Sequence, residues 1–286
     1  MHARLVSLIF ALASPFMASA QTLELIGQFD FETESIFGVS GIEVSADGLQ
    51  FMAVADNGWW FNGRFERDGE RIVGIADTMI RPILGSDGAP VAARRLSDWS
   101  DAEGLAVLPD GRAWVAFERW ARVARYDGVM SKAQWIKDHT TFYDHAENWQ
   151  LEAVAVDPSG TVYAFSEKPL IEGFPIYRLA GKTWVIDGYL PEQDVFAIVG
   201  ADFDENGDLY LLERKLVVGL WWQNRVRRVR LDGTEDIVLW TGERDEYENL
   251  EGLSVWRDDK GLRMTLVSDN NGKDKPTQFV EFRLTE

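Results

Sequence analysis

Short apolar runs separated by polar turns recur along most of this chain of 286 residues. Each repeat opens on a small residue, continues as a short apolar strand, turns at a dipeptide that ends in Gly, and returns as a second apolar strand that ends on an acid. The repeats are residues 39–56, 102–118, 151–167, 198–213 and 250–269. Their turns are Asp47-Gly48, Asp110-Gly111, Ser159-Gly160, Asn206-Gly207 and Lys260-Gly261. Such dipeptides accept the positive φ that tight hairpins require, so each repeat predicts a β-hairpin.

A third strand follows each hairpin, and in most repeats a fourth strand follows it, as at Thr183–Asp187. Four antiparallel strands in a radially repeated unit form the blade of a β-propeller. The opening small residues recur at intervals of 47 to 63 residues and are Gly41, Gly104, Ala153, Gly200 and Gly252. The pattern therefore predicts an all-β fold, a single β-propeller of five blades, with room for a sixth in the long first interval. A pair of β-sandwiches is the competing fold, but it does not predict five matching turns.

The last repeat has room for only three strands after Gly252. A strand pattern near the N-terminus, Leu23–Phe31, supplies a fourth. We therefore expect this strand to complete the last blade and close the ring, which removes an exposed sheet edge and ties down both ends of the propeller.

The first twenty residues have the pattern of a secretory signal peptide. Arg4 gives a basic start, Leu5–Phe16 is apolar, and Ala18-Ser19-Ala20 is the small-residue site that a signal peptidase cleaves. We expect cleavage after Ala20, a propeller domain over residues 21–286, and a periplasmic or secreted protein. A retained anchor helix is the alternative, although the apolar stretch is shorter than the roughly 20 residues that span a bilayer. No later segment is apolar enough to predict a membrane span.

The chain is acidic, with 47 Asp and Glu against 29 Lys and Arg and a formal net charge of −18. A field of this sign excludes binding of nucleic acid or anionic lipid through overall charge. The absence of Cys excludes disulfides, thiolate metal sites and thiol nucleophiles. We expect a monomer whose partner is a small anionic substrate or ligand.

One set of acids directly precedes the opening small residue of three repeats: Glu103, Glu152 and Glu251. Ser40 and Val199 stand there in the other two. The first strand of each blade lines the axis of a propeller, so these carboxylates should converge. Converging carboxylates need protons or a cation, and a ligand set of oxygens alone suits Ca²⁺. The set predicts a metal site. The alternative is that each acid accepts hydrogen bonds from the backbone of its own blade.

A second set of acids ends the second strand of each repeat: Asp56, Glu118, Glu167, Glu213 and Asp269. A cation or an amide follows each of them: Asn57, Arg119, Lys168, Arg214 and Asn270. We expect Glu118 and Glu167 to be catalytic and the residues that follow the acids to bind substrate, because an Arg fork matches phosphate or carboxylate. The alternative is a row of local salt bridges at strand ends, which stabilise little when exposed.

Four segments resemble the bacterial phytase-like family, described as "esterase-like activity of phytase": Glu103–Gly111 with its strand ending at Glu118, Val123–Gly128, Leu151–Glu167, and Asn249–Leu253. The resemblance covers essentially the whole chain after Ala20. It implies an exported propeller that hydrolyses phosphate or carboxylic esters with Ca²⁺ as cofactor, and it carries over the recurring acids Glu103, Glu118, Glu152, Glu167 and Glu251. Val199 departs from a complete ring of acids. A non-catalytic propeller of the cell envelope that binds a ligand or a protein is the alternative, because the chain has no nucleophile motif.

Overall fold

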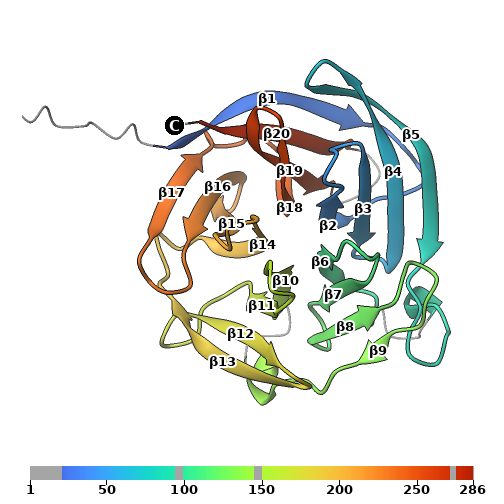
Figure 1. Ribbon diagram of the computed structural model, residues 1–286, viewed down its shortest axis with the longest axis vertical. Helices are drawn as coiled ribbons and strands as arrows, with labels where there is room; N and C mark the ends of the chain where they lie inside the picture. The colour runs from blue at the N-terminus through green and yellow to red at the C-terminus, as the bar shows by residue number, and fades with distance from the viewer. Residues whose placement is uncertain (1–20, 94–98, 145–149, 271–274, 286) are drawn as a thin grey trace, which may run out of the picture.

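The computed structural model describes residues 21–93, 99–144, 150–270 and 275–285. They form five antiparallel sheets of four strands each, arranged around one axis (Figure 1). The predicted five-bladed propeller is therefore confirmed. The long interval between Gly41 and Gly104 is taken up by the long outer strands of the first blade and the segment after them, and the described residues form no sixth blade.

Each blade is written from its inner to its outer strand. Blade one is β2 (Val39–Val44), β3 (Gln50–Ala55), β4 (Trp59–Asp68) and β5 (Arg71–Pro82). Blade two is β6 (Ala102–Val107), β7 (Ala113–Phe117), β8 (Arg122–Tyr126) and β9 (Gln134–Trp135). Blade three is β10 (Leu151–Val156), β11 (Val162–Ser166), β12 (Phe174–Ala180) and β13 (Thr183–Leu190). Blade four is β14 (Ala197–Phe203), β15 (Leu209–Val217), β16 (Trp221–Val229) and β17 (Asp236–Thr241). Blade five is β18 (Asn249–Asp258), β19 (Gly261–Asp269), β20 (Thr277–Thr285) and β1 (Thr22–Phe31). Two short 3₁₀ helices, η1 (Val91–Ala93) and η3 (Thr140–Tyr143), lie in connections between blades.

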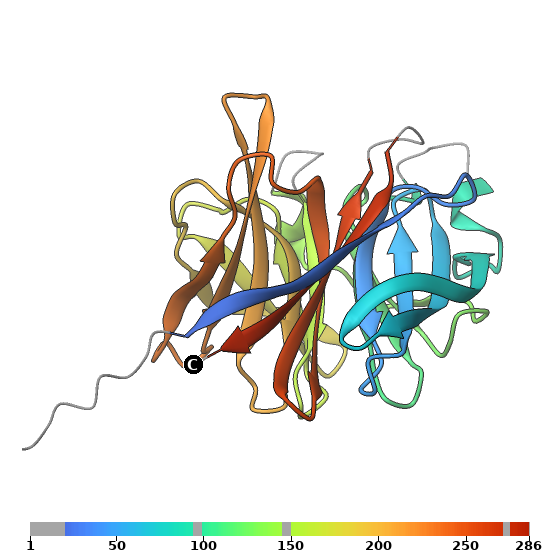
Figure 2. The same ribbon diagram turned by 90° about the horizontal axis from the view of Figure 1, so that it is seen from above.

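The ring closes as predicted, with β1 as the fourth strand of blade five. It pairs antiparallel with β20, in a register that places Leu23 opposite Leu284 and Phe31 opposite Thr277. Figure 2 shows β1 crossing the outer side of this blade. The expected signal peptide, Met1–Ala20, lies outside the described residues and stays a prediction. Among the residues that the structure does describe, no helix has the length and apolar character needed to cross a membrane.

The apolar core is divided into five clusters, and each cluster lies between two neighbouring blades. Between blades one and two, the rings of Trp60 and Tyr126 meet edge to face with centroids 5.3 Å apart. Between blades one and five, the rings of Phe51 and Phe279 are 5.5 Å apart. Both faces of a blade are therefore buried, which explains why the sequences of the strands are nearly continuous apolar runs.

The five inner strands touch backbone to backbone at the axis. A Cβ built on Gly104 would lie 2.7 Å from the backbone nitrogen of Val154, and one built on Gly252 would lie 2.7 Å from the backbone oxygen of Ser40. At four of the five opening positions, Gly41, Gly104, Gly200 and Gly252, the neighbouring blade thus leaves no room for a side chain. The cavity left at this waist has a volume of about 10 Å³, which is room for about one water molecule.

We predict that Gly104→Ala lowers the free energy of unfolding by about 2–3 kcal/mol, because the added methyl overlaps the backbone of β10. Ala153→Gly is the matched control, since Ala153 opens the third repeat and already carries a Cβ. It should cost about 1 kcal/mol at most. Urea denaturation of both variants measures the difference, and equal losses in the two would contradict the close approach of the blades.

Candidate metal centre at one end of the propeller axis

Each inner strand carries a one-residue bulge directly before its opening small residue. The pairing with the neighbouring strand skips one residue in every blade: Ser40, Glu103, Glu152, Val199 and Glu251. A bulge turns the extra side chain away from the regular pleat and is common beside active sites. Glu103, Glu152 and Glu251 are all buried. The first set of acids is therefore directed by five equivalent bulges.

In blade four, the pairing of the strands shows that a different residue occupies the position of the second set of acids. The backbone N–H of Glu118 donates to Asp101 at 3.0 Å, and that of Glu167 donates to Gln150 at 3.0 Å. In blade four the equivalent pair is Arg214 with Ala197. The second set as folded is therefore four acids and one arginine: Asp56, Glu118, Glu167, Arg214 and Asp269.

Glu213, which the sequence placed in this set, lies one residue earlier and turns into blade four instead. Its carboxylate is 2.6 Å from Nε of Arg225 and 3.1 Å from Nη2 of Arg227, and its side chain is buried. From its opening small residue to its first closing acid, the repeat in blade four is one residue shorter than the repeats in blades two and three. A slip of one residue moves a side chain to the opposite face of a strand, which explains the error.

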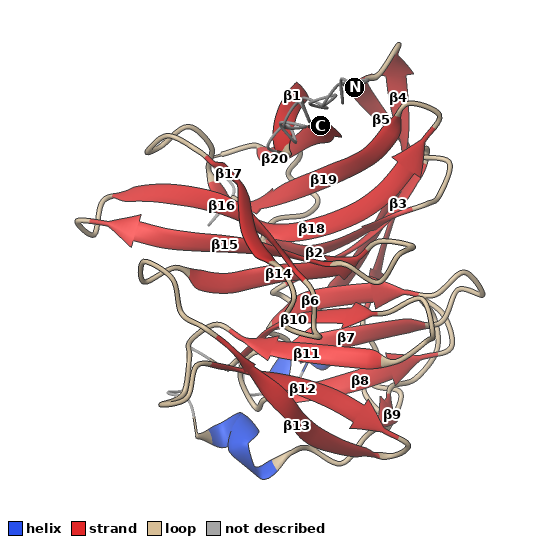
Figure 3. Ribbon diagram, turned by 60° about the vertical axis from the view of Figure 1, so that its left-hand side comes forward, coloured by secondary structure: helices blue, strands red, loops and turns tan. Residues whose placement is uncertain are grey.

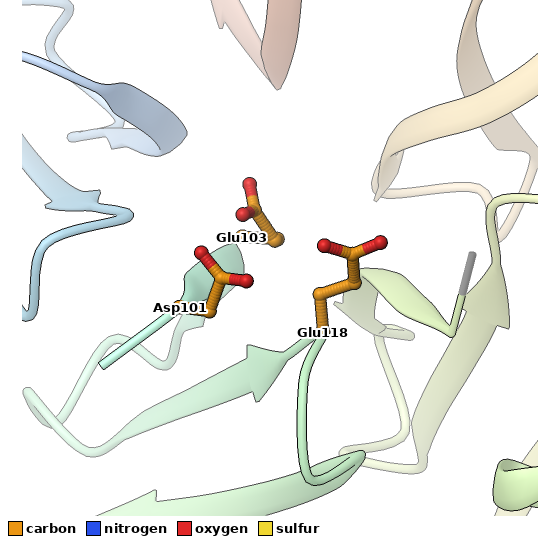
Figure 4. Close-up of side chains that lie close together, drawn as sticks. All are labelled: Asp101, Glu103 and Glu118. Atoms are coloured by element: carbon orange, nitrogen blue, oxygen red, sulfur yellow. The ribbon is translucent and has the colours of Figure 1, made fainter. Parts of the chain in front are cut away.

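The two sets of acids meet at the same end of the axis. Ligand oxygens of Asp101, Glu103 and Glu118 lie within 4.8 Å of one another, and so do those of Glu118, Glu152 and Glu167. Figure 4 shows the first three side chains pointing toward one another from blade two. We call these two groups the carboxylate triads, and they share Glu118.

Asp101 belongs to the first triad, although the sequence pattern did not predict it. It stands directly before β6, two residues ahead of Glu103, and its backbone oxygen pairs with Glu118. The signal was present in the sequence, because residues two apart on a strand usually share a face. The bulge at Glu103, which is visible only in the pairing of β6 with β7, brings the carboxylate of Glu103 close to that of Asp101.

Arg214 is a counter-charge inside the cluster. Its Nη1 donates to Glu251 and, at 2.7 Å, to Oδ1 of Asn249, and its Nη2 lies 3.4 Å from Oε1 of Glu167. The guanidinium also lies over the ring of Trp222, 5.1 Å from its centroid. Burial disfavours the charge on Arg214, but the surrounding carboxylates outweigh it and raise its pKa. Glu251 is thus held by Arg214, whereas Glu103 and Glu152 each belong to a triad.

The single positive charge of Arg214 does not neutralise all the buried carboxylates at this end of the axis. Burial, reinforced by neighbouring acids, raises the pKa of Glu103 and of Glu152 well above the usual range. Burial raises the pKa of Glu118 to about 8, with Asp101 and Glu167 adding to the effect. Burial and then Asp269 raise the pKa of Asp56 to about 8. The cluster therefore favours protons or a cation at neutral pH.

An unpaired oxygen points to a ligand in the same place. Oδ1 of Asp56 is buried and has no hydrogen-bond partner within the described ranges. An unpaired buried acceptor costs about 1–3 kcal/mol, and a bound cation or a donor group on a ligand removes that cost. Carboxylate oxygens on several strands suit a hard divalent ion such as Ca²⁺ or Mg²⁺. The residues present therefore fit a divalent cation.

The five residues predicted to bind substrate have different surroundings. Nε of Arg119 lies 3.2 Å from Asp101, and its side chain is 40% exposed. Lys168 directly follows Glu167 and is partly buried. Asn57 donates to the backbone of Phe37 at 3.2 Å. Asn270 accepts from Gly38 at 3.0 Å and donates to Lys275 at 3.0 Å, so it connects backbone segments. Arg214 is enclosed by acids.

The opposite mouth of the axis is chemically different. Past the waist, a pocket of about 660 Å³ is lined by Glu43, Met52, Val107 and Trp256, among others, and by none of the triad residues. Burial, followed by Asp202, raises the pKa of Glu43 well above its usual range. Ser254 donates to Glu43 at 3.4 Å. The acid-rich centre and this pocket are therefore separate, because the waist between them is nearly closed.

Comparisons with known proteins agree with the fold. A family model described as "Phytase-like: Esterase-like activity of phytase" matches residues 34–272. An α-L-arabinofuranosidase from Podospora anserina, solved in complex with cellotriose, has a TM-score of 0.51 and 11% identity over 93% of this chain and 97% of that one. A luciferin-regenerating enzyme has a TM-score of 0.47 and 12% identity over 93% and 96%. At 11% identity, the similarity to the α-L-arabinofuranosidase shows the fold alone. No curated protein matches the chain significantly.

The raised pKa values predict how stability depends on pH in the absence of a divalent cation. Asp56 and Glu118 have a pKa of about 8 when folded and about 4 when unfolded, so the folded chain binds protons more tightly. This contribution to stability is fully present below pH 4 and is lost as the pH rises through 8. We expect the thermal midpoint in EDTA to fall by about 5 °C or more between pH 6 and pH 9. Millimolar Ca²⁺ should reduce that fall, and a midpoint that rises with pH in EDTA would contradict the cluster as described.

Proposed function

Because the chain belongs to the phytase-like family described by an esterase-like activity, we propose that it hydrolyses phosphate or carboxylic esters with the help of a divalent cation. The observation that supports this proposal most directly is the pair of carboxylate triads that share Glu118. Ca²⁺ is the first candidate because it accepts many oxygen ligands in flexible geometry. The expected signal peptide implies that the reaction takes place in the periplasm or outside the cell, and we propose a monomer.

The triads would hold the ion. We assign Asp101, Glu103, Glu118 and Glu152 as its ligands, which leaves Glu167, the remaining member of the triads, available for proton transfer. A bound divalent ion polarises the ester and lowers the pKa of a bound water molecule. Glu251, which the sequence suggested as a third ligand beside Glu103 and Glu152, accepts a hydrogen bond from Arg214, and we propose that it positions this arginine.

Two acids outside this set of ligands are suited to proton transfer. Asp56, whose pKa is raised to about 8 by burial when no ion is bound, is our candidate for the general acid that protonates the leaving group. Glu167 forms an ion pair with Arg214 and lies in the triad that shares Glu118. We propose that Glu167 accepts the proton of the attacking water.

Cations beside the cluster would hold the anionic part of the substrate. Arg119 is the most accessible of the arginines at this end that are named above, and Lys168 follows Glu167 directly. Arg119 presents a fork that matches phosphate or carboxylate. The pairing of Arg119 with Asp101 links substrate binding to the first triad. Asn57 has a buried Oδ1 with no partner within the described segments, so it is a further candidate contact.

We predict that Glu118→Gln reduces kcat at least a hundredfold, because this one substitution removes a charged ligand from both triads. The assay measures release of alcohol or phosphate from phosphomonoesters, carboxylic esters and lactones, in Ca²⁺, in Mg²⁺ and in EDTA. Glu205→Gln is the control, because Glu205 is an exposed acid in the turn after β14 that pairs with the exposed Arg257. The control should retain the activity of the original chain.

Two results would overturn the proposal. Turnover that is unchanged in EDTA excludes a catalytic divalent ion. Binding of Ca²⁺ and of anionic ligands without turnover of any ester class favours the alternative of a non-catalytic ligand-binding propeller.

A further inference from the structure

The hairpin between β15 and β16 extends beyond the propeller at the acidic end of the axis (Figures 2 and 3). Both strands have 9 residues, whereas β7, β8 and β11 have 5. The extension starts just after Arg214 and adds the pairs Lys215 with Gln223, Leu216 with Trp222 and Val217 with Trp221. We call residues 215–223 the finger. At about 3.3 Å per residue, its tip stands about 10 Å above Arg214.

The tip of the finger exposes large apolar side chains to water. Val218 is 77% exposed, Leu220 is 69% exposed and Leu216 is 49% exposed. Trp221, next toward the base, is 40% exposed. Extending a hairpin in this way buries little apolar surface within the propeller. Contiguous exposed apolar surface of this kind marks a site of interaction.

The turn at the tip is strained as well as exposed. Leu220 donates to the backbone oxygen of Val217 at 3.1 Å, and both central residues have positive φ, 54° at Val218 and 70° at Gly219. Such a turn favours Asn-Gly, and a β-branched residue at positive φ is an outlier. Strain held in an exposed position indicates a function for the Val218 side chain, since its packing against the described residues does not account for it.

The order of side chains along the finger matches the layers of a lipid surface. Aliphatic residues form the tip, Trp221 and Trp222 come next, and Lys215 and Gln223 lie at the base. Aliphatic groups suit the acyl region, Trp suits the interface and Lys suits the head groups. Peripheral segments insert about 5–10 Å, which is the length of this extension.

The charge of the finger favours the same partner. The finger contains Lys215 and no Asp or Glu, in a chain whose net charge is −18. The finger is thus the part of this acidic end that can approach head groups without repulsion. The remaining acids oppose an anionic surface, so the partner is a zwitterionic one. A convex apolar tip also suits a deformable acyl layer, whereas a protein partner needs a matching groove.

Other exposed apolar side chains lie at the same end of the axis. Trp120 is two residues after Glu118, Ile171 is four residues after Glu167, and Val195 is two residues before Ala197. All three are more than half exposed. They come from three different connections, so the apolar contact is not confined to one loop.

We propose that the finger inserts its tip into a zwitterionic lipid surface and thereby holds the acidic end of the propeller against that surface. This docking is independent of the proposed hydrolysis, and it is compatible with the absence of a spanning helix in the described residues. Its consequence is that the ligands of the acidic centre include molecules presented at a membrane.

Flotation with phosphatidylcholine vesicles tests the proposal. The chain from Gln21 onward is used, because it contains every described strand and lacks the apolar segment Leu5–Phe16. We expect this chain to float with the vesicles and Val218→Asn to bind about tenfold more weakly. The thermal midpoint of Val218→Asn should be equal or higher, because Asn tolerates positive φ. A loss of binding therefore cannot be a loss of folding.

Val73→Asn is the matched control, since Val73 is 55% exposed on the outer strand β5, away from the finger. It should bind vesicles like the original chain. The proposal is overturned if the original chain does not float, or if Val218→Asn floats equally well. A change from dimer to monomer in Val218→Asn, with no change in flotation, would also overturn it and identify the finger as a contact between copies.

Discussion

The close approach of five inner strands at the axis is the constraint on which the rest of this propeller depends. Glycine at four of the five opening positions lets the backbone of each blade touch the next, and the waist that results is nearly closed. The bulge directly before each of these positions sends one side chain per blade to the same end of the axis. Where that side chain is Glu, the fold itself brings carboxylates together.

Crowding of this kind is costly, and the chain offsets only part of the cost. Arg214 stands where the other blades place an acid, and it is held by Glu251, Asn249 and Glu167. The raised pKa values of Asp56, Glu103, Glu118 and Glu152 show that the remaining charge is still unfavourable. A protein gains nothing in stability from such a cluster, which is why we interpret it as a binding site.

The sequence predicted the blades and their closure because both depend on local patterns. A short stretch of sequence is enough to recognise a turn dipeptide, an apolar run or the strand Leu23–Phe31. The candidate site was predicted only in part, because it depends on register. Counting to the first acid placed Glu213 in the ring, whereas the pairing of β14 with β15 places Arg214 there. Asp101 was missed because it does not recur: the equivalent positions of the other repeats are Gly38, Gln150, Ala197 and Asn249.

Calorimetric titration with Ca²⁺ in buffers of different ionisation enthalpy tests the central claim most directly. If the ion replaces the protons that the buried carboxyls hold, binding at pH 7 releases about one proton or more per ion, and the release disappears above pH 9. Binding at pH 7 without proton release, or no binding at all, would contradict the account of this cluster as a cation site.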